Sequence, residues 1–98
     1  MQVTGYIPEL RDIIRGYKKK GKRVSFVPTM GALHGGHLSL IRLAKKHSDV
    51  VVVSIYVNPK QFAPNEDFAS YPSTLKQDLN FCEQEGVSLI FTPDTEVM

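Results

Sequence analysis

The most constraining feature of the sequence is an apolar run near its middle, Val50–Val57, broken only by Ser54. The run is rich in β-branched side chains and lacks an alternation of apolar and polar residues, which is typical of a strand covered on both faces. Such a strand belongs to a parallel sheet with helices packed on its two sides. A membrane span needs about 20 apolar residues. The run therefore predicts a buried strand of an α/β fold and no membrane span.

The rest of the chain alternates between helix-like and strand-like patterns. Apolar residues recur at spacings of three and four in three segments, and two further short apolar runs each stop at a proline. The predicted elements are a helix from Ile7 to about Lys20 (with Gly21 closing it), a strand over Val24–Val27 ended by Pro28, a helix over about Leu38–His47, the strand Val50–Val57, a helix capped by Ser73 or Thr74 and ended by Gly86, and a strand over Val87–Phe91. Right-handed crossovers turn this order into a parallel sheet with helices on its faces. The third predicted strand is expected at an unprotected edge of that sheet.

Composition narrows the class of protein further. Ninety-eight residues make one small domain, and a hydrophobic content of 42% is ordinary for a globular chain. The formal net charge of +2 is too small to indicate nucleic acid or a membrane surface, and the basic run Tyr17–Arg23 is interpreted as a solvated helix end. The single cysteine, Cys82, fits a reducing compartment, and the N-terminus shows no signal-peptide pattern. We expect a cytoplasmic protein with no nucleic-acid or membrane partner.

Two loops lie where ligands are expected to bind. In parallel α/β sheets, ligands bind beyond the carboxyl ends of the strands. Residues 28–37 follow the first predicted strand, and residues 58–72 follow the second. The second loop is long for a structureless connection, which itself suggests a function. The functional residues are therefore expected in these two segments.

The first loop contains the sequence His34-Gly35-Gly36-His37 at the junction of a strand and a helix. A helix N-terminus offers backbone N–H groups to phosphate, glycine lets the backbone approach a ligand, and two imidazoles three positions apart can donate to phosphate oxygens. The loop is no P-loop, because the Gly-Lys-Ser/Thr ending is absent. A zinc site would need four ligands, and only His47 and Cys82 remain without a supporting spacing. On these four residues alone, a plain tight turn with surface histidines stays an alternative.

Longer blocks of sequence carry a resemblance to a known family. The segment FVPTMGALHGGHLSL, residues 26–40, resembles the signature of pantothenate synthetases (pantoate–β-alanine ligases), which belong to the Rossmann-like nucleotidyltransferases with a His-x-Gly-His motif. The match continues, in order, through residues 51–62, 64–68, 71–72 and 86–93. The resemblance implies a Rossmann-like three-layer α/β/α fold with a parallel sheet. Residues 1–98 would form the N-terminal part of its nucleotide-binding domain.

The resemblance also implies an activity and a set of site residues. Members of the family condense pantoate with β-alanine at the expense of ATP, through pantoyl adenylate, giving pantothenate, AMP and pyrophosphate. Magnesium is expected with the ATP, no metal ligand is assigned to the protein, and a homodimer is expected. The implied ATP-contacting residues are Met30, Gly31, Ala32, Leu33, His34, Gly35, Gly36 and His37; the catalytic pair is His34 and His37, with His37 as proton donor. The implied pantoate and β-alanine contacts are Gln61, Pro28, Thr29, Met30 and Asn58.

Three departures from the family pattern qualify this expectation. Gly35 stands where the family usually has an acidic residue, and Ser73 stands where it usually has arginine. The chain also stops at Met98, before the later phosphate-binding motif and the C-terminal domain, so we expect an N-terminal fragment that is inactive alone. A non-catalytic ligand-binding fragment and another adenylyltransferase with the same histidine motif are the alternatives. The block Val57–Phe62 argues against the second of these.

Overall fold

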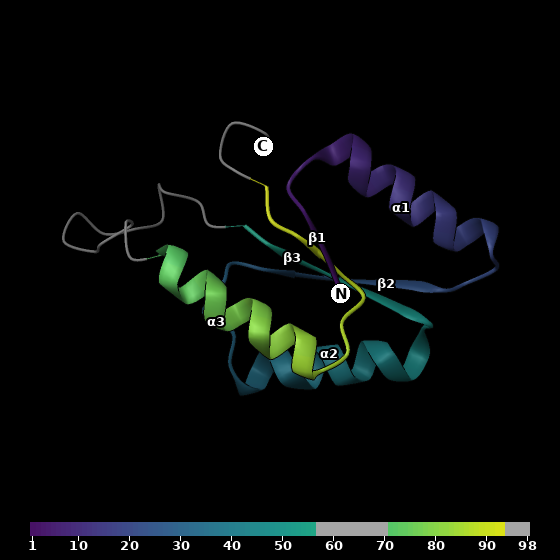
Figure 1. Cartoon of the computed structure of the whole chain (residues 1–98). Coiled ribbons are helices and arrows are strands. Elements are labelled where there is room, and N and C mark those ends of the chain that lie inside the picture. The colour runs from purple at the N-terminus through teal and green to yellow at the C-terminus, as the bar shows by residue number, and fades with distance from the viewer. Residues whose placement is uncertain (57–70, 94–98) are drawn as a thin grey trace.

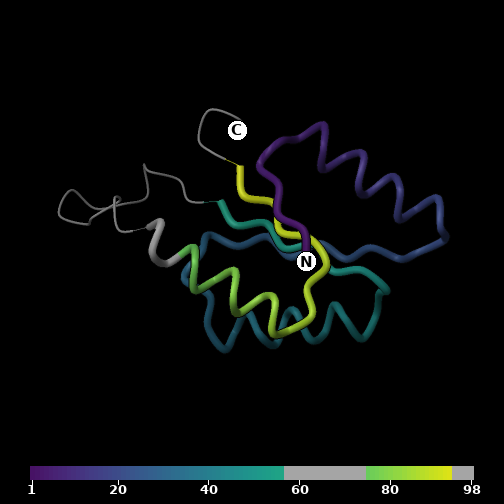
Figure 2. Tube along the Cα trace, viewed as in Figure 1, coloured from purple at the N-terminus to yellow at the C-terminus, as the bar shows by residue number. Residues whose placement is uncertain are grey.

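The computed structural model describes residues 1–56 and 71–93, with the side chains of residues 71–74 left out. Its elements are β1 (Gln2–Thr4), α1 (Ile7–Lys19), β2 (Val24–Thr29), α2 (Gly35–His47), β3 (Val50–Ile55), α3 (Tyr71–Gln84) and β4 (Leu89–Phe91). The four strands form one parallel sheet in the order β1-β4-β3-β2. Figure 1 shows α1 on one face of this sheet and α2 with α3 on the other, and the same layering is seen in the chain trace of Figure 2. The predicted α/β fold is confirmed.

The central strand β3 is the core of the molecule, as its sequence predicts. All six of its residues are buried. Val51, Val53 and Ile55 face the helices α2 and α3, where they pack in one cluster with buried residues such as Ile41 and Cys82. Val50 and Val52 face α1 and pack in a second cluster with Leu89, covered by three side chains of that helix: Leu10, Ile13 and Tyr17. One apolar run therefore serves two cores, which is why it shows no alternation.

The first strand, β1, is missing from the prediction. Its three residues are too few to show a periodicity, and two of them are exposed. Pairing with β4 creates the strand, because Gln2 and Thr4 lie opposite Leu89 and Phe91. The amide of Gln2 donates to the carbonyl of Ser88 at 3.1 Å, and the amide of Thr92 donates to the carbonyl of Thr4 at 2.8 Å.

The presence of β1 changes the edges of the sheet. The strand β4 lies between β1 and β3 and is therefore internal, so the expectation of an unprotected edge at the third predicted strand is wrong. The edges within the described residues are β1 and β2. The helix α1 carries the chain from one edge to the other across one face, and this crossing leaves the opposite face to α2 and α3.

Several predicted boundaries move. The strand β2 continues through Pro28 to Thr29, so the predicted end at Val27 is wrong. Proline is tolerated because β2 lies at an edge: the carbonyl of Thr29 faces β3 and accepts from the amide of Tyr56 at 3.0 Å, so the nitrogen of Pro28 faces the open side. The buried strand ends at Ile55, and Val57 lies outside the described residues.

The helices differ from prediction mainly at their beginnings. The first helix fits its pattern, with Pro8 in its first turn and Gly21 in a left-handed conformation (φ 75°) after its end. The second begins at Gly35, three residues before the predicted Leu38, and the third begins at Tyr71, ahead of the predicted cap at Ser73 or Thr74. Gly86 (φ 79°) follows the third helix as expected, and β4 begins at Leu89, two residues after the predicted Val87.

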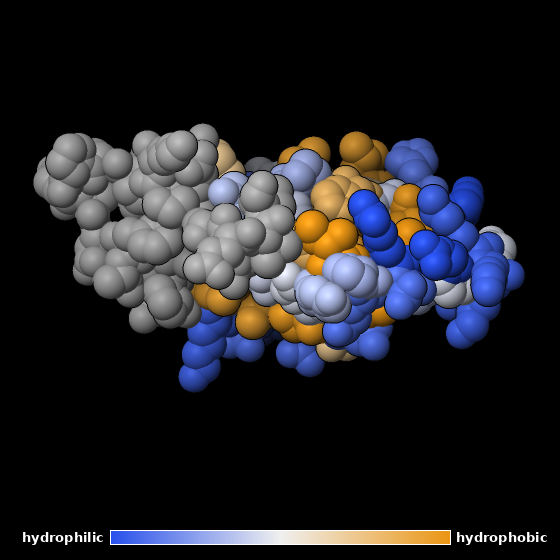
Figure 3. Space-filling view, turned by 90° about the horizontal axis from the view of Figure 1, so that it is seen from above, coloured by the Kyte–Doolittle hydropathy of each residue, from blue (hydrophilic) through white to orange (hydrophobic). Residues whose placement is uncertain are grey.

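The basic run lies at the end of the sheet opposite the loop that joins β2 to α2. Because α1 leads into the amino end of β2, Lys18–Lys20, Lys22 and Arg23 gather there, all of them exposed. Figure 3 shows hydrophilic residues on the right of the view, where this end of α1 lies. The backbone amide of Arg23 donates a hydrogen bond to the carboxylate of Asp49 at 2.9 Å. This pattern supports the interpretation of the run as a solvated helix end.

Candidate active site

The loop between β2 and α2 lies at the carboxyl end of the sheet, where the sequence predicts the site. It turns sharply because Gly31 and Ala32 adopt positive φ angles of 89° and 52°. Thr29 anchors its beginning: the hydroxyl of this buried residue donates to the carbonyl of Ser54 at 2.9 Å and accepts from the amide of Gly31 at 3.3 Å. The turn is thereby fastened to the central strand β3.

The far side of the loop is held by Asp78 of α3, a residue that sequence reasoning missed. Its carboxylate accepts from the amides of Ala32 at 3.0 Å and Leu33 at 2.9 Å, and the residue is only 3% exposed. The sequence contains a signal for it. Asp78 stands three residues after Leu75 and four before Cys82, so it is an acidic residue on the apolar face of the helix.

The two histidines form a reciprocal cap at the start of α2. His34 Nδ1 accepts from the amide of Gly36 at 3.1 Å, and His37 Nδ1 accepts from the amide of His34 at 3.2 Å. The ring centroids are 4.3 Å apart. An imidazole nitrogen that accepts a hydrogen bond carries no proton, so both neutral rings hold their proton on Nε2. The site therefore presents two adjacent Nε2–H donors.

The charge state of His37 follows from its surroundings. Partial burial lowers the pKa of His37 below its ordinary value of 6.5, and the neighbouring His34 lowers it further, while Asp78 acts in the opposite direction. The cap has the same preference, because protonation of Nδ1 would remove the acceptor for the amide of His34. His37 is thus favoured as a neutral donor of a hydrogen bond.

The backbone amides of this helix start are partly used by the side chains. The amide of Gly36 donates to His34, and the capping box also directs the amide of His37 at the His34 side chain, whereas the amide of Gly35 has no hydrogen-bond partner within residues 1–56 and 71–93. A phosphate at this helix start would meet the amide of Gly35 together with the imidazole donors. The helix start therefore offers a phosphate fewer open amides than the sequence suggests.

The glycines of the motif have different roles. A Cβ at Gly36 would lie 3.0 Å from Cε1 of the His34 ring, so the bare backbone leaves room for that ring. A Cβ at Gly35 would meet nothing within 4 Å. The departure from the family pattern at Gly35 therefore removes a side chain from open space and leaves the packing of the turn unchanged.

A hollow of about 310 Å³ opens beside the loop at the carboxyl ends of β2 and β3. Pro28, Thr29 and Met30, which sequence similarity implies as pocket walls, line it together with Ser54 and Tyr56. The last two were missed, because both read as residues of the buried strand. The other two implied contacts, Asn58 and Gln61, lie outside the described residues.

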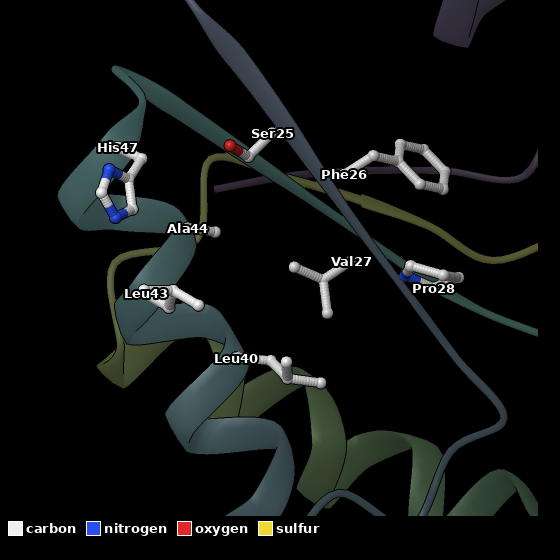
Figure 4. A pocket seen from close by; sticks show the side chains of 8 residues that line it. All are labelled: Ser25, Phe26, Val27, Pro28, Leu40, Leu43, Ala44 and His47. Carbon is white, nitrogen blue, oxygen red and sulfur yellow. The ribbon is translucent and has the colours of Figure 1, made fainter.

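A second, larger hollow of about 470 Å³ lies along the open edge of β2. Figure 4 shows Val27 of the strand and Leu40 of α2 pointing into the space between the two elements, with His47 at one end and Phe26 on the other side of the strand. Leu40 and Leu43 are more than half exposed. This surface is apolar and offers a phosphate only one titratable side chain, so it is distinct from the site at the histidines.

The described residues do not favour a metal site. Among residues 1–56 and 71–93, no group of three His, Cys, Asp or Glu side chains could hold a metal ion. Cys82 is fully buried, and burial with a contribution from Asp78 raises the pKa of its thiol to about 11. The raised pKa disfavours the free thiolate, which is the form that a metal binds. Among the described residues, His34 and His37 have no third side chain that could join them around a zinc ion.

The helices also bear on membrane association. In the part of the chain that the structure describes, no helix is both long enough and apolar enough to cross a bilayer.

The fold and this loop define an α/β protein of the kind that binds its ligand at the carboxyl edge of a parallel sheet. The profile of the family described as Pantoate-beta-alanine ligase matches residues 2–98. The chain belongs to the pantoate–β-alanine ligase family.

Similar proteins agree with this assignment. A pantothenate synthetase of Thermoanaerobacter sp. (strain X514) is 57% identical over the whole chain, and one of Photobacterium profundum is 53% identical. The pantothenate synthetase structure of Thermus thermophilus superposes on the whole chain with a TM-score of 0.80 and 41% identity, covering 34% of that protein. The pantoate–β-alanine ligase of Francisella tularensis, solved in complex with β-γ ATP and β-alanine, superposes over 98% of the chain with a TM-score of 0.80 and 44% identity, covering 36% of that protein.

The chain spans about a third of the length of these curated relatives, 35% and 33% respectively.

Proposed function

We propose that the full-length protein that contains this chain condenses pantoate with β-alanine, using ATP and releasing AMP and pyrophosphate. The family membership over residues 2–98 supports the reaction. The observation that carries the proposal in this chain is the capped histidine pair, His34 and His37, at the carboxyl end of the sheet.

The first half-reaction would join pantoate to AMP. A carboxylate oxygen of pantoate attacks the α-phosphorus of ATP, the bond from that phosphorus to the bridging oxygen breaks, and pyrophosphate leaves with the electron pair. Charge grows on the phosphate oxygens during this step, so fixed hydrogen-bond donors stabilise its transition state. The Nε2–H groups of His34 and His37 are suited to that task, because the caps hold both rings in place before the ligand arrives.

The second half-reaction would transfer the pantoyl group to β-alanine. The amine attacks the acyl carbon of pantoyl adenylate, AMP leaves, and the amine loses a proton. The hollow lined by Pro28, Thr29 and Met30 lies next to the histidine loop, which suits a small acid that must reach the α-phosphorus. Gln61 and Asn58 are proposed to contact pantoate and β-alanine on sequence similarity alone.

The role of His37 is refined by its environment. Sequence similarity implies a proton donor, whereas a neutral ring with its proton on Nε2 is best placed to donate a hydrogen bond that strengthens as charge develops. We propose the hydrogen-bonding role. Magnesium would accompany the ATP phosphates, bound mainly through the nucleotide and water, as is usual for this ion.

The organisation of the whole protein is part of the same proposal. Residues 1–98 would form the N-terminal part of a Rossmann-like nucleotide-binding domain, and a further C-terminal domain would complete the site. A homodimer in the cytoplasm, with no nucleic-acid partner, fits the family, the modest net charge and the free buried thiol of Cys82. The chain by itself would bind ligands weakly and turn over little.

The test is isotope exchange between pyrophosphate and ATP in the full-length protein, since exchange reports the first half-reaction alone. We expect exchange that requires pantoate and does not require β-alanine. A hydroxy acid of another length is the control and should support little exchange. Exchange that proceeds without pantoate would contradict the proposal and would favour another adenylyltransferase with the same histidine motif.

A further inference from the structure

Asp78 stands out among the side chains that the proposed reaction does not use. It is a carboxylate on the apolar face of α3, only 3% exposed, and a buried carboxylate is costly unless it is fully hydrogen-bonded. Both of its oxygens are used, one by the amide of Ala32 at 3.0 Å and one by the amide of Leu33 at 2.9 Å. These partners lie more than 40 residues away in the chain. A contact of this kind fixes one element relative to another.

The segment that Asp78 grips needs such support. Ala32 holds a positive φ of 52°, a conformation that a side chain disfavours, directly after Gly31 at 89°. In this conformation two successive amides point in nearly the same direction, and one carboxylate can accept from both. Without it, those two part-buried amides would lose their acceptors and the turn could relax.

The hydrogen bonds of Asp78 are connected to those of the two histidines through the backbone of residues 32–36. Leu33 is bonded to Asp78, and the next amide, that of His34, donates to His37 Nδ1 at 3.2 Å. The amide of Gly36 then donates to His34 Nδ1 at 3.1 Å. Four of the five amides from Ala32 to Gly36 are thus bound by side chains, in one connected series that begins at Asp78.

We propose that Asp78 is a positioning residue: it sets the turn at Ala32 and Leu33 and so aims the imidazoles of His34 and His37 at the phosphate. This inference rests on the proposed function. Asp78 has both oxygens engaged by backbone amides and is nearly inaccessible, so its effect on ATP is exerted through the loop. The acyl-transfer step to β-alanine should depend on it far less.

The experiment uses the full-length protein and the variants D78N and D78A. Asparagine keeps the size of the side chain but retains one acceptor of the two, so D78N should weaken the grip, and D78A should remove it. L89A is the matched control, because Leu89 is fully buried in the core under α1, on the opposite face of the sheet. It destabilises the fold without touching the loop. All measurements are made at a temperature where each variant remains folded.

We expect kcat for pantoate-dependent exchange to fall about 10- to 100-fold in D78N and further in D78A, as a displacement of about 1 Å at a reacting group can produce. The KM for β-alanine in the complete reaction should change less than twofold. L89A should keep kcat within about twofold of the original. Equal losses in L89A and D78N would show that Asp78 acts through stability alone and would overturn the inference.

A second readout does not depend on the reaction. Nitrogen NMR of the histidine side chains in the unmodified protein should show Nε2–H tautomers at His34 and His37. In D78N the signals of both rings should move toward a mixture of tautomers. Unchanged signals would contradict the inference even if activity fell, and recovery of D78N by excess magnesium would show instead that Asp78 acts through a metal ion. If the unmodified protein shows no exchange, the proposed function fails while the NMR measurement still tests the grip.

Discussion

Two kinds of residue form the histidine loop site: His34 and His37, which are proposed to contact the phosphate, and Asp78 of α3, which holds the loop backbone. Sequence reasoning found the pair His34 and His37, because two imidazoles separated by glycines at a strand–helix junction are a local pattern. It missed Asp78, because the partners of this residue are backbone amides of a distant segment. Nothing in the local sequence around residue 78 reveals that contact. Only its place on an apolar helix face marks it.

The two glycines of the motif yield a matched pair of substitutions. Gly36→Ala places a Cβ 3.0 Å from the His34 ring, which can swing aside at little cost to folding but would then lose its bond to the Gly36 amide. We expect exchange activity to fall about tenfold or more, with the thermal midpoint of the full-length protein nearly unchanged. Gly35→Ala meets open space and should retain activity. Similar activity in the two variants would contradict the role assigned to the His34 cap.

The lowered pKa of His37 has a consequence for pH dependence. The neutral ring is the form that the cap holds, and protonation at Nδ1 removes the acceptor for the His34 amide. Because the folded pKa lies below the ordinary 6.5, the capped form persists above that pH and is lost as the pH falls through the lowered value. The pantoate-dependent exchange rate in the full-length protein should therefore decline only below pH 6.5. An acidic limb centred at or above that pH would contradict the lowered pKa of His37.

At the scale of elements, the buried parts of the fold were predictable and the paired or capped parts were not. The uniformly apolar composition of β3 predicted its burial, and the spacing of apolar residues in α1 predicted a helix. The strand β1 exists because β4 offers it a partner, and α2 begins at Gly35 because His34 and His37 cap it. Pro28 misled the prediction for β2, since the rule that proline ends a strand does not hold at a sheet edge.

The helix α2 is held to the sheet by one fully buried side chain, Ile41. Ile41→Ala should lower the free energy of unfolding of the full-length protein by about 2–5 kcal/mol, because it leaves a cavity in the larger core. Lys46→Ala, on the exposed side of the same helix, is the control and should change it by less than about 0.5 kcal/mol. Urea denaturation measures both. A loss below about 1 kcal/mol for Ile41→Ala would contradict the packing described for α2.

At the scale of the whole molecule, the chain presents a formed loop beside an open edge. The strand β2 is an edge of the sheet, and the apolar surface between it and α2 exposes half or more of Phe26, Leu40 and Leu43. The chain also spans only about a third of its curated relatives. The sequence predicted a parallel sheet but not its strand order, since the order depends on which face each helix crosses.

The proposal that the remaining part of the protein completes the site has a direct consequence. A protein consisting of residues 1–98 should form pantothenate at less than about a thousandth of the rate of the full-length protein, because the later phosphate-binding groups would be absent. Product formation from labelled β-alanine measures both. Comparable rates would show that this chain contains the complete catalytic apparatus.

The central claim is that the capped imidazoles stabilise the transferring phosphate, and one measurement tests it most directly: pantoate-dependent pyrophosphate–ATP exchange in the full-length protein carrying His37→Ala. The third histidine, His47, lies exposed at the other end of α2, so His47→Ala is the control. We predict that His37→Ala lowers the exchange rate about 100- to 1,000-fold, as loss of a fixed transition-state donor does, while His47→Ala stays within about twofold. Equal rates in the two variants would contradict the claim.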